Sequence, residues 1–278
     1  MVQSPSLKLN NGVELPQLGL GTARVGDEEI RRTVAQALGV GYRLIDTASK
    51  YENEVGVGQG IADAGLPRED VFVTTKLRGA DQGFESAMRA LDASLHRLGL
   101  DYVDLYLIHW PLPRLDRYVQ TWRALEELLE QGRTRAIGVS NFLPAHLDRL
   151  AAESSTVPAV NQIELHPELP QDEQRADHAK RGIVTQSWSP LAMAGALLDH
   201  PVLAQIGAKH GKSSAQVVLR WHVQLGLAVV PKASHPDRLS ANLDVFDFAL
   251  DTDDVTRIAG LATGRRVGGQ DPATHEEY

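Results

Sequence analysis

The chain has 278 residues, of which 42% are hydrophobic and 23% charged, a composition typical of a globular protein with a large core. The formal net charge of −8, from 28 basic and 36 acidic residues without a Lys/Arg run, excludes the basic surface of a nucleic-acid-binding protein. The absence of cysteine excludes disulfides, thiolate chemistry, cysteine-ligated zinc and iron–sulfur clusters, and it fits a reducing compartment.

The first expected element is a β-hairpin, because alternating apolar residues flank Asn11 and Gly12, a pair typical of a type I′ turn. From Leu18 onward, short apolar strands alternate with amphipathic helices. Strands are predicted at 18–21, 43–46, 71–76, 103–110, 135–140, 159–163, 183–188 and 228–232. Helices are predicted at 27–38, about 53–64, 83–98, 118–131, 144–152, 172–181, 202–210, 215–225, around 238, and 253–261. The segment from Gly264 is expected to be an exposed tail.

These elements make eight strand–helix units, and no Pro/Gly/Ser linker or low-complexity segment divides them. The strands are short continuous apolar runs, as in parallel strands that are buried on both faces. We therefore predict an α/β fold, one closed (β/α)8 TIM barrel, with the hairpin at the barrel bottom. Residues 1–278 are expected to form a single domain, with a C-terminal tail at about 264–278.

Polar or flat aromatic side chains stand at the C-terminal ends of seven of the eight strands. In a barrel of this kind these ends converge on one face, where the loops build the active site. Each residue alone has an ordinary explanation, such as a capped strand end, a solvated lysine or a core histidine. Their joint occurrence on one face is harder to explain in that way. The residues are Asp46, Lys76, His109, Ser140 with Asn141, Gln162, Trp188 with Ser189, and Lys232.

Three of these residues and Tyr51, in the loop after the second strand, form a set suited to donating a proton. A phenol has a pKa of about 10, which a neighbouring lysine ammonium lowers, while a carboxylate holds the lysine in place. Tyr51 could then protonate a developing alkoxide, and His109 could donate a hydrogen bond to the same oxygen. The sequence shows no nucleophile–base pair and no metal-binding spacing, so we expect an external reductant, a nicotinamide.

The sequence has no G-x-G-x-x-G fingerprint, since the glycine-rich run at 56–60 lies within a predicted helix. A Rossmann site is therefore not expected. Lys232 and Arg238 are better candidates for binding phosphate, because they flank a strand end and the start of a helix, whose amide groups attract anions. Basic residues at such positions are also common on ordinary surfaces.

Three stretches, GYRLIDTASKYENEVGVG (41–58), RAIGVSNF (135–142) and VPKASHPDRLSAN (230–242), resemble the aldo-keto reductase family. DLYLIHWP (104–111) and VNQIELHP (160–167) add to the resemblance, which covers nearly the whole chain. Within the family, the sequence is similar to the bacterial 2,5-diketo-D-gluconate reductase-like group. The resemblance implies a (β/α)8 barrel that binds extended NADPH at its C-terminal face without a Rossmann domain.

The resemblance also implies roles for individual residues. Asp46, Tyr51, Lys76 and His109 match the catalytic tetrad of the family, with Tyr51 as the general acid. The positions that match cofactor contacts are Ser140, Asn141 and Gln162 at the carboxamide, Trp188 stacked on the nicotinamide, Ser189 and Leu191 beside it, Lys232 and Arg238 at the 2′-phosphate, and Asn242 at the adenine.

Three positions depart from the family pattern. Ala233 stands where Ser or Thr usually touches the 2′-phosphate, and Ala241 where an acidic adenine contact is common, so strict preference for NADPH over NADH is weakened. Arg78 stands where relatives often have a pocket tryptophan. We hypothesise that Arg78, with Trp110, lines the substrate mouth and favours anionic or strongly hydrated carbonyl substrates. The alternative is that Arg78 simply faces solvent.

We predict NADPH-dependent reduction of aldehydes or ketones to alcohols, with hydride from nicotinamide C4 and the proton from Tyr51. Small dicarbonyls such as methylglyoxal, or diketo sugar acids, are the expected substrates, and no metal, nucleic-acid or membrane partner is expected. The start lacks signal-peptide features and no apolar window approaches about 18 residues, so a cytoplasmic monomer is expected. The alternatives are an NADPH-binding regulatory or sensor subunit with little turnover, and a Schiff-base lyase that uses Lys76.

Overall fold

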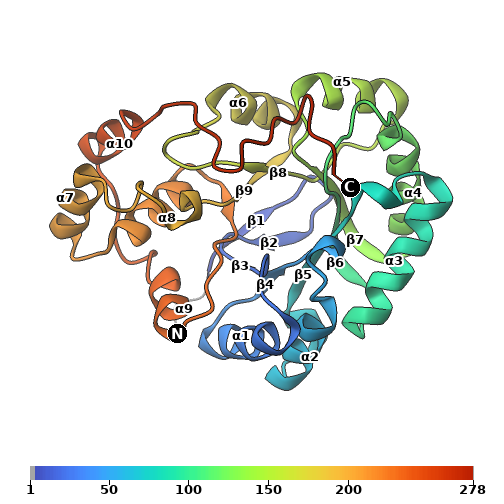
Figure 1. Cartoon of the computed structure of the whole chain (residues 1–278), viewed down its shortest axis with the longest axis horizontal. Coiled ribbons are helices and arrows are strands. Elements are labelled where there is room, and N and C mark those ends of the chain that lie inside the picture. Colours follow the sequence, from blue (N-terminus) through green and yellow to red (C-terminus); the bar gives the residue numbers. More distant parts are fainter. Residues whose placement is uncertain (1–3, 278) are drawn as a thin grey trace.

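The computed structural model describes residues 4–277, and its centre is a barrel of parallel strands surrounded by helices (Figure 1). Eight strands follow one another around the barrel in chain order. Gly19 N donates to Val229 O (2.9 Å) and Gly21 N to Pro231 O (3.0 Å), and these bonds join the last strand to the first. The predicted closed (β/α)8 barrel is therefore confirmed. The strands are β3 (Leu20–Gly21), β4 (Leu44–Asp46), β5 (Phe72–Leu77), β6 (Val103–Ile108), β7 (Thr134–Ser140), β8 (Val160–Glu164), β9 (Val184–Trp188) and β10 (Ala228–Val229).

Two strands are shorter at their C-terminal ends than the apolar runs predict. Strand β6 ends at Ile108, so His109 lies in the following loop, although its N–H still donates to Leu77 O (3.1 Å). Strand β10 ends at Val229. Pro231 has no N–H to continue the ladder, and only its carbonyl takes part, as acceptor for Gly21.

The predicted helices all form, with ends shifted by one or two residues. Most of them bury an apolar stripe, which in α1 includes Ile30, Val34 and Leu38. Helix α6 differs, since its buried side chains are the polar Gln174 and His178. Among residues 4–277, none of the helices is both long and apolar enough to cross a bilayer. The α-helices are α1 (Asp27–Val40), α2 (Glu54–Ala64), α3 (Phe84–Leu98), α4 (Tyr118–Glu130), α5 (Pro144–Glu153), α6 (Asp172–Arg181), α7 (Pro201–His210), α8 (Ser214–Gln224), α9 (Pro236–Leu243) and α10 (Thr252–Ala259). The short 3₁₀ helices are η1 (Ser49–Tyr51), η2 (Arg68–Asp70), η3 (Gly79–Asp81) and η4 (Ala192–Ala194).

The glycine-rich run in α2 serves helix packing. A Cβ on Gly56 would lie 2.3 Å from the carbonyl oxygen of Asp27, and one on Gly60 would lie 2.5 Å from that of Arg31. Helix α2 therefore packs directly against the backbone of α1, which only residues without a side chain allow. This packing agrees with the prediction that the run is not a dinucleotide fingerprint.

The N-terminal hairpin, β1 (Ser6–Lys8) and β2 (Glu14–Pro16), closes the bottom of the barrel as predicted. Leu7 pairs with Leu15, and Leu15 is buried together with Leu9 against the side chains of Leu44 and Phe72 in the barrel interior. These contacts place the hairpin at the N-terminal ends of the parallel strands, away from the face where their polar C-terminal residues lie.

The predicted type I′ turn is wrong. The loop has three residues, 10–12, and of these only Gly12 has a positive φ (+88°), while its N–H donates to Leu9 O (2.9 Å). The amide side chains explain the difference. Asn10 donates to Pro158 O (3.2 Å) and Asn11 to Arg135 O (2.9 Å), so both asparagines bind the barrel backbone. A single glycine in the left-handed region is typical of a three-residue hairpin loop.

The tail that follows α10 crosses the C-terminal end of the barrel (Figure 1, red ribbon). Thr263 N and Gly264 N donate to Glu168 O (3.0 and 2.9 Å), so the tail is attached to the β8–α6 loop at its start. Its last described residue, Glu277, has a side chain only 7% exposed. The prediction of an exposed terminal segment is therefore wrong at this end, because the tail folds back onto the strand ends.

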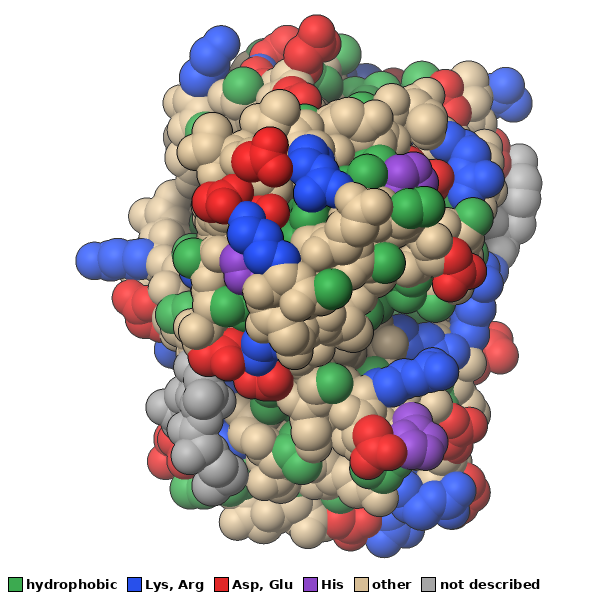
Figure 2. Space-filling model, turned by 90° about the vertical axis from the view of Figure 1, so that its left-hand side faces the viewer, with side chains coloured by type: hydrophobic (Ala, Val, Ile, Leu, Met, Phe, Trp, Pro, Cys, Tyr) green, Lys and Arg blue, Asp and Glu red, His purple; other side chains and the backbone are tan. Residues whose placement is uncertain are grey.

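On the side formed by α7, α8 and α10, acidic and basic side chains are interspersed and apolar ones are scattered (Figure 2). Ion pairs connect the elements of this side. Lys209 in α7 pairs with Asp251 (2.5 Å) and Asp254 (3.0 Å), and Lys212 pairs with Asp244 (2.7 Å) at the end of α9. The charged residues here are engaged in holding the outer helices together.

Candidate active site

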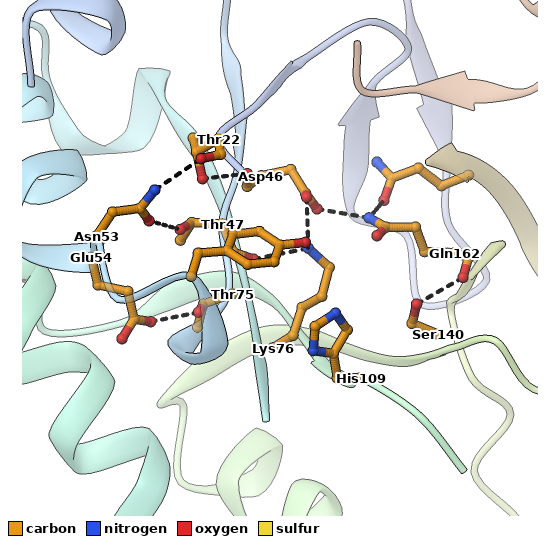
Figure 3. A network of polar contacts seen from close by, with 12 residues as sticks. Thr22, Asp46, Thr47, Asn53, Glu54, Thr75, Lys76, His109, Ser140 and Gln162 are labelled. Carbon is orange, nitrogen blue, oxygen red and sulfur yellow. Dashed lines mark hydrogen bonds and ion pairs between the residues drawn. The ribbon is translucent and has the colours of Figure 1, made fainter. Parts of the chain in front are cut away.

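A buried ion pair lies at the centre of the C-terminal face (Figure 3). Asp46 is the last residue of β4, and Lys76 lies in the adjacent strand β5. Asp46 pairs with Thr74 in the sheet, so Lys76, two residues further on, points to the same interior face. Lys76 Nζ is 2.6 Å from Asp46 Oδ1 and donates to Thr47 O (2.9 Å), and its side chain is 0% exposed.

Tyr51 is brought to this pair by the 3₁₀ helix η1. Ser49 Oγ donates to Lys76 O (3.0 Å) and thereby ties η1 to β5. The Tyr51 hydroxyl lies 3.4 Å from Lys76 Nζ, and the His109 ring stands edge-on to the Tyr51 ring at 5.9 Å between centroids. The structure thus brings together all four residues of the predicted tetrad.

The environment of Tyr51 keeps the phenol protonated. Burial raises the pKa of Tyr51 and is the largest of the effects on it. The charge of Lys76 lowers this pKa and is the next largest effect, and the charge of Asp46 raises it. The net pKa is raised above its ordinary value of 10.0, whereas a lysine neighbour alone predicts a lowered one. The lysine acts in the expected direction, but burial outweighs it. Tyr51 therefore carries its proton at neutral pH.

Lys76 is charged in spite of its burial. Burial lowers the pKa of Lys76, but the negative charge of Asp46 raises it, as do Tyr51 and the hydrogen bond to Asp46, so the net pKa is raised. A buried ammonium is stable only when a negative charge lies close to it, and the Asp46 carboxylate supplies that charge.

The second oxygen of Asp46 is held from the far side of the barrel. Gln162 in β8 donates from Nε2 to Asp46 Oδ2 (2.7 Å) and also to Gln186 Oε1 in β9 (2.6 Å). Both N–H groups of Gln162 are thereby used, and its amide orientation is fixed. Gln186 was not predicted as a site residue. It contributes by positioning Gln162, and through it Asp46.

A second polar network anchors the loop that carries Tyr51 (Figure 3). Thr47 Oγ1 donates to Asn53 Oδ1 (3.1 Å), and Asn53 Nδ2 donates to Thr22 O (2.8 Å). In the same network, Thr75 Oγ1 in β5 donates to Glu54 Oε1 at the start of α2 (2.6 Å). These bonds join β3, β5 and the start of α2 around η1, so the position of the phenol depends on several elements.

The predicted carboxamide-binding residues form one connected group beside the tetrad. Ser140 Oγ at the end of β7 donates to Gln162 O (2.8 Å), and Asn141 Nδ2 donates to Ser140 Oγ (3.1 Å) and to His109 O (3.0 Å). Trp188, the last residue of β9, donates from Nε1 to Asn141 Oδ1 (2.8 Å). Asn141 has a φ of 63°, a conformation that asparagine adopts more readily than most residues. Ser189 and Leu191 follow Trp188 in the next loop.

The predicted phosphate-binding residues lie in the segment before α9 and in its first turn. Lys232 follows β10 and Arg238 lies in the first turn of α9, and both side chains are exposed. Lys232 Nζ donates to Arg24 O (3.1 Å) in the loop after β3. Asn242, further along the same helix, is buried. Two exposed cations beside a helix N-terminus suit a phosphate group.

The two proposed substrate-pocket residues differ in their surroundings. Arg78 follows β5 and forms an ion pair with Asp81 (2.8 Å), with 46% of its side chain exposed. Trp110 is buried, and its ring lies against His275 of the tail at 4.2 Å between centroids.

Glu277 is the site residue that sequence reasoning missed. Its Oε1 lies 2.8 Å from His109 Nδ1, and its Oε2 accepts a hydrogen bond from Gly79 N (2.7 Å). The sequence contains the acidic pair Glu276 and Glu277 after His275, but the position of these residues in the fold depends on the path of the tail. Local patterns do not encode such a path.

The residues present fit a nicotinamide dinucleotide. A partly exposed tryptophan stands at the rim beside amide and hydroxyl groups, and exposed cations lie at the start of α9. These are the apolar, hydrogen-bonding and phosphate-binding elements that such a cofactor requires.

A model of the aldo/keto reductase family matches residues 17–263. The chain belongs to this family. An aldo-keto reductase of Mycolicibacterium smegmatis is 54% identical over 271 residues, which cover 98% of each chain. A morphine 6-dehydrogenase of Pseudomonas putida is 49% identical over 280 residues, covering 96% of this chain and 94% of the relative.

Solved structures of aldo-keto reductases and related proteins are also similar. That of a Gox0644 variant in complex with NADPH has a TM-score of 0.94 and 44% identity, covering 99% of this chain and 100% of that one. That of a Bombyx mori aldo-keto reductase in complex with NADP has a TM-score of 0.91 and 37% identity, covering 96% and 95%. Membership in this aldo-keto reductase family confirms the predicted enzyme class, an NADP-dependent oxidoreductase, and NADP(H) as the cofactor.

Proposed function

We propose that the protein reduces aldehydes or ketones to alcohols, with Tyr51 as the proton donor to the carbonyl oxygen. One observation carries this proposal: the buried Lys76 ammonium lies between Asp46 and the Tyr51 hydroxyl, at 2.6 and 3.4 Å. When bound, NADPH supplies the hydride. The residues of the chain bind and orient the substrate and deliver the proton.

The same arrangement explains how a phenol with a raised pKa can still give up its proton. As the proton moves to the substrate oxygen, a phenolate forms next to the Lys76 ammonium. The attraction between these opposite charges is strong because Lys76 is fully buried and Tyr51 is partly buried. Asp46 keeps the ammonium charged and in position. His109 stands beside the phenol and orients the carbonyl oxygen by a hydrogen bond.

We also propose the cofactor contacts that the resemblance implies. The connected group around Asn141 supports a role in holding the carboxamide, since its polar side chains already have fixed orientations. Trp188 provides a flat surface for the nicotinamide, and the exposed cations at α9 provide charge for the 2′-phosphate. The residues assigned are Ser140, Asn141, Gln162, Trp188, Ser189, Leu191, Lys232, Arg238 and Asn242.

The substrates are proposed to be small dicarbonyls such as methylglyoxal, or diketo sugar acids as in the 2,5-diketo-D-gluconate reductase-like group, with Arg78 and Trp110 at the mouth. The test is a panel of these compounds and aromatic aldehydes with NADPH, together with morphine and NADP+ for the reverse direction, oxidation of an alcohol, since one relative is named a morphine 6-dehydrogenase. Consumption of NADPH with at least one carbonyl compound, and less with NADH, is expected. Tight NADPH binding without consumption across the panel would favour a sensor subunit.

We also propose that the protein is a cytoplasmic monomer.

A Schiff-base lyase that uses Lys76 is disfavoured. A lysine forms a Schiff base only as the neutral amine. Asp46, at 2.6 Å, raises the pKa of Lys76 in spite of burial, so the amine is charged. A lyase would also leave the placement of Tyr51 unexplained.

The substitution Lys232→Gly is expected to raise the KM for NADPH by about 10- to 100-fold, because a charge-assisted bond to the 2′-phosphate is lost. The KM for NADH, which has no 2′-phosphate, is expected to change by less than about two-fold. Steady-state kinetics with both cofactors measure this difference. Lys180→Gly, at an exposed lysine in α6, is the control. Equal changes in both KM values would contradict the phosphate role of Lys232.

A further inference from the structure

The carboxylate of Glu277 lies on the catalytic histidine. Glu277 Oε1 is 2.8 Å from His109 Nδ1, Oε2 accepts from Gly79 N at 2.7 Å, and the side chain is 7% exposed. His109 is the group that must bind the carbonyl oxygen of a substrate. The tail therefore places a carboxylate oxygen on the histidine that the proposed mechanism assigns to the oxygen of the substrate.

Contacts near both ends of the tail support the position of Glu277. At its root, Val267 N donates to the buried carboxylate of Glu164 (2.6 Å). Near its end, the His275 ring lies against Trp110 (4.2 Å between centroids), and Glu276 lies 3.9 Å from Arg114. The tail is thus attached on both sides of the strand ends, and it passes over them between the two attachments (Figure 1).

Gly79 makes room for the end of the tail. A Cβ at position 79 would lie 2.6 Å from the carbonyl oxygen of Glu277 and 2.5 Å from a methyl group of Leu112. The leucine side chain can rotate away, but the backbone of the tail would have to move. The loop after β5 is therefore shaped to accept this segment.

Glu277 carries a negative charge at neutral pH. Burial raises the pKa of this carboxyl group, but the hydrogen bond to His109, the charge of that ring, the N–H of Gly79 and the charge of Lys50 together lower it. The nearby cation Arg78 is paired with Asp81 at 2.8 Å, which weakens its attraction for other anions. The mouth of the site therefore holds an anion, and the charge of Arg78 is already matched.

We propose that Glu277 is a specificity-determining residue that holds the place of the substrate oxygen on His109 and selects against anionic carbonyl compounds. This inference rests on the proposed function and narrows its substrates to uncharged or cationic aldehydes and ketones, so it favours small dicarbonyls such as methylglyoxal over the anionic diketo sugar acids. Every substrate must displace the Glu277 carboxylate. A substrate with its own negative charge must also enter while that carboxylate remains close by on the tail, and like charges at short distance repel strongly where water is excluded.

The test compares two aldehydes of nearly equal shape, 4-carboxybenzaldehyde, which is anionic, and its uncharged methyl ester. Glu277→Gln keeps the size of the side chain and removes the charge. It is expected to raise kcat/KM for the anion by about 10-fold or more relative to the ester. Glu69→Gln, the same change at an exposed glutamate in η2, is the matched control and is expected to leave the ratio within about two-fold.

Gly79→Ala provides a second variant that leaves the tail sequence intact. The added methyl group displaces the end of the tail, so the preference is expected to shift in the same direction as in Glu277→Gln. An unchanged ratio of the two substrates in both variants would overturn the proposal.

A binding measurement separates this inference from the proposed function. If the wild-type protein and its variants consume no NADPH with any aldehyde, the proposed function fails. The affinity of the NADPH complex for benzoate, measured by calorimetry, then decides the inference. Glu277→Gln is expected to bind benzoate about 10-fold more tightly than the wild-type protein, and equal affinities would contradict the role of Glu277.

Discussion

Replacement of Tyr51 by phenylalanine is expected to lower kcat by about 1,000-fold and to leave the Kd for NADPH unchanged. The ring and its packing stay, but the proton donor is lost, and general acid catalysis typically contributes about 10²- to 10⁴-fold. The Lys76 ammonium, 3.4 Å from the hydroxyl, then has no phenolate to stabilise. Steady-state turnover and a fluorescence titration with NADPH measure the two quantities.

Tyr102→Phe is the control for this substitution. Tyr102 lies near the N-terminal end of β6, with Arg68 over its ring at 4.2 Å, and takes no part in the tetrad. Its loss of a hydroxyl group is expected to leave kcat unchanged. Full activity of the Tyr51→Phe variant would show that another group delivers the proton.

Asp46→Asn is expected to reduce both stability and turnover. Without the carboxylate at 2.6 Å, burial of Lys76 is no longer offset, and removing one partner of a buried ion pair costs about 3–5 kcal/mol of unfolding free energy. Loss of that charge also lowers the pKa of Lys76, so the ammonium that stabilises the phenolate is weakened. We expect kcat to fall by about 100-fold. Urea unfolding and turnover at neutral pH measure the two effects.

Asp104→Asn separates the effect on stability from the effect on catalysis. Asp104 is equally buried and pairs with Arg68 (2.8 Å) and Arg135 (2.7 Å), but it lies at the start of β6, at the opposite end of the barrel. Its replacement is expected to lower the free energy of unfolding and to leave kcat unchanged. Similar losses of kcat in both variants would mean that Asp46 acts only through stability.

Most of the barrel could be predicted from the sequence because its signals are local. Apolar runs mark the buried strands, and the polar residue at each strand end marks the face on which Asp46, Lys76 and His109 meet. The same local reasoning was wrong for the hairpin turn. There the side chains of Asn10 and Asn11 bind the backbone of Pro158 and Arg135, which are distant in sequence.

The remaining features of the site depend on contacts between distant segments. Gln162 reaches Asp46 across the barrel, and Glu277 reaches His109 from the end of the chain. The raised pKa of Tyr51 was not predicted either, because it depends on how far the folded chain buries the phenol. A sequence identifies the groups that can interact, but burial and the path of the tail decide how strongly they do.

In the proposed mechanism, Tyr51 and its partners make the protein a catalyst that turns over carbonyl compounds. The most direct measurement is the amount of alcohol formed by the wild-type protein with excess NADPH and the best carbonyl compound of the panel. We expect many alcohol molecules for each protein molecule, with one NADPH consumed for each alcohol. Tight binding of NADPH with no more than a single alcohol formed for each protein molecule would contradict it.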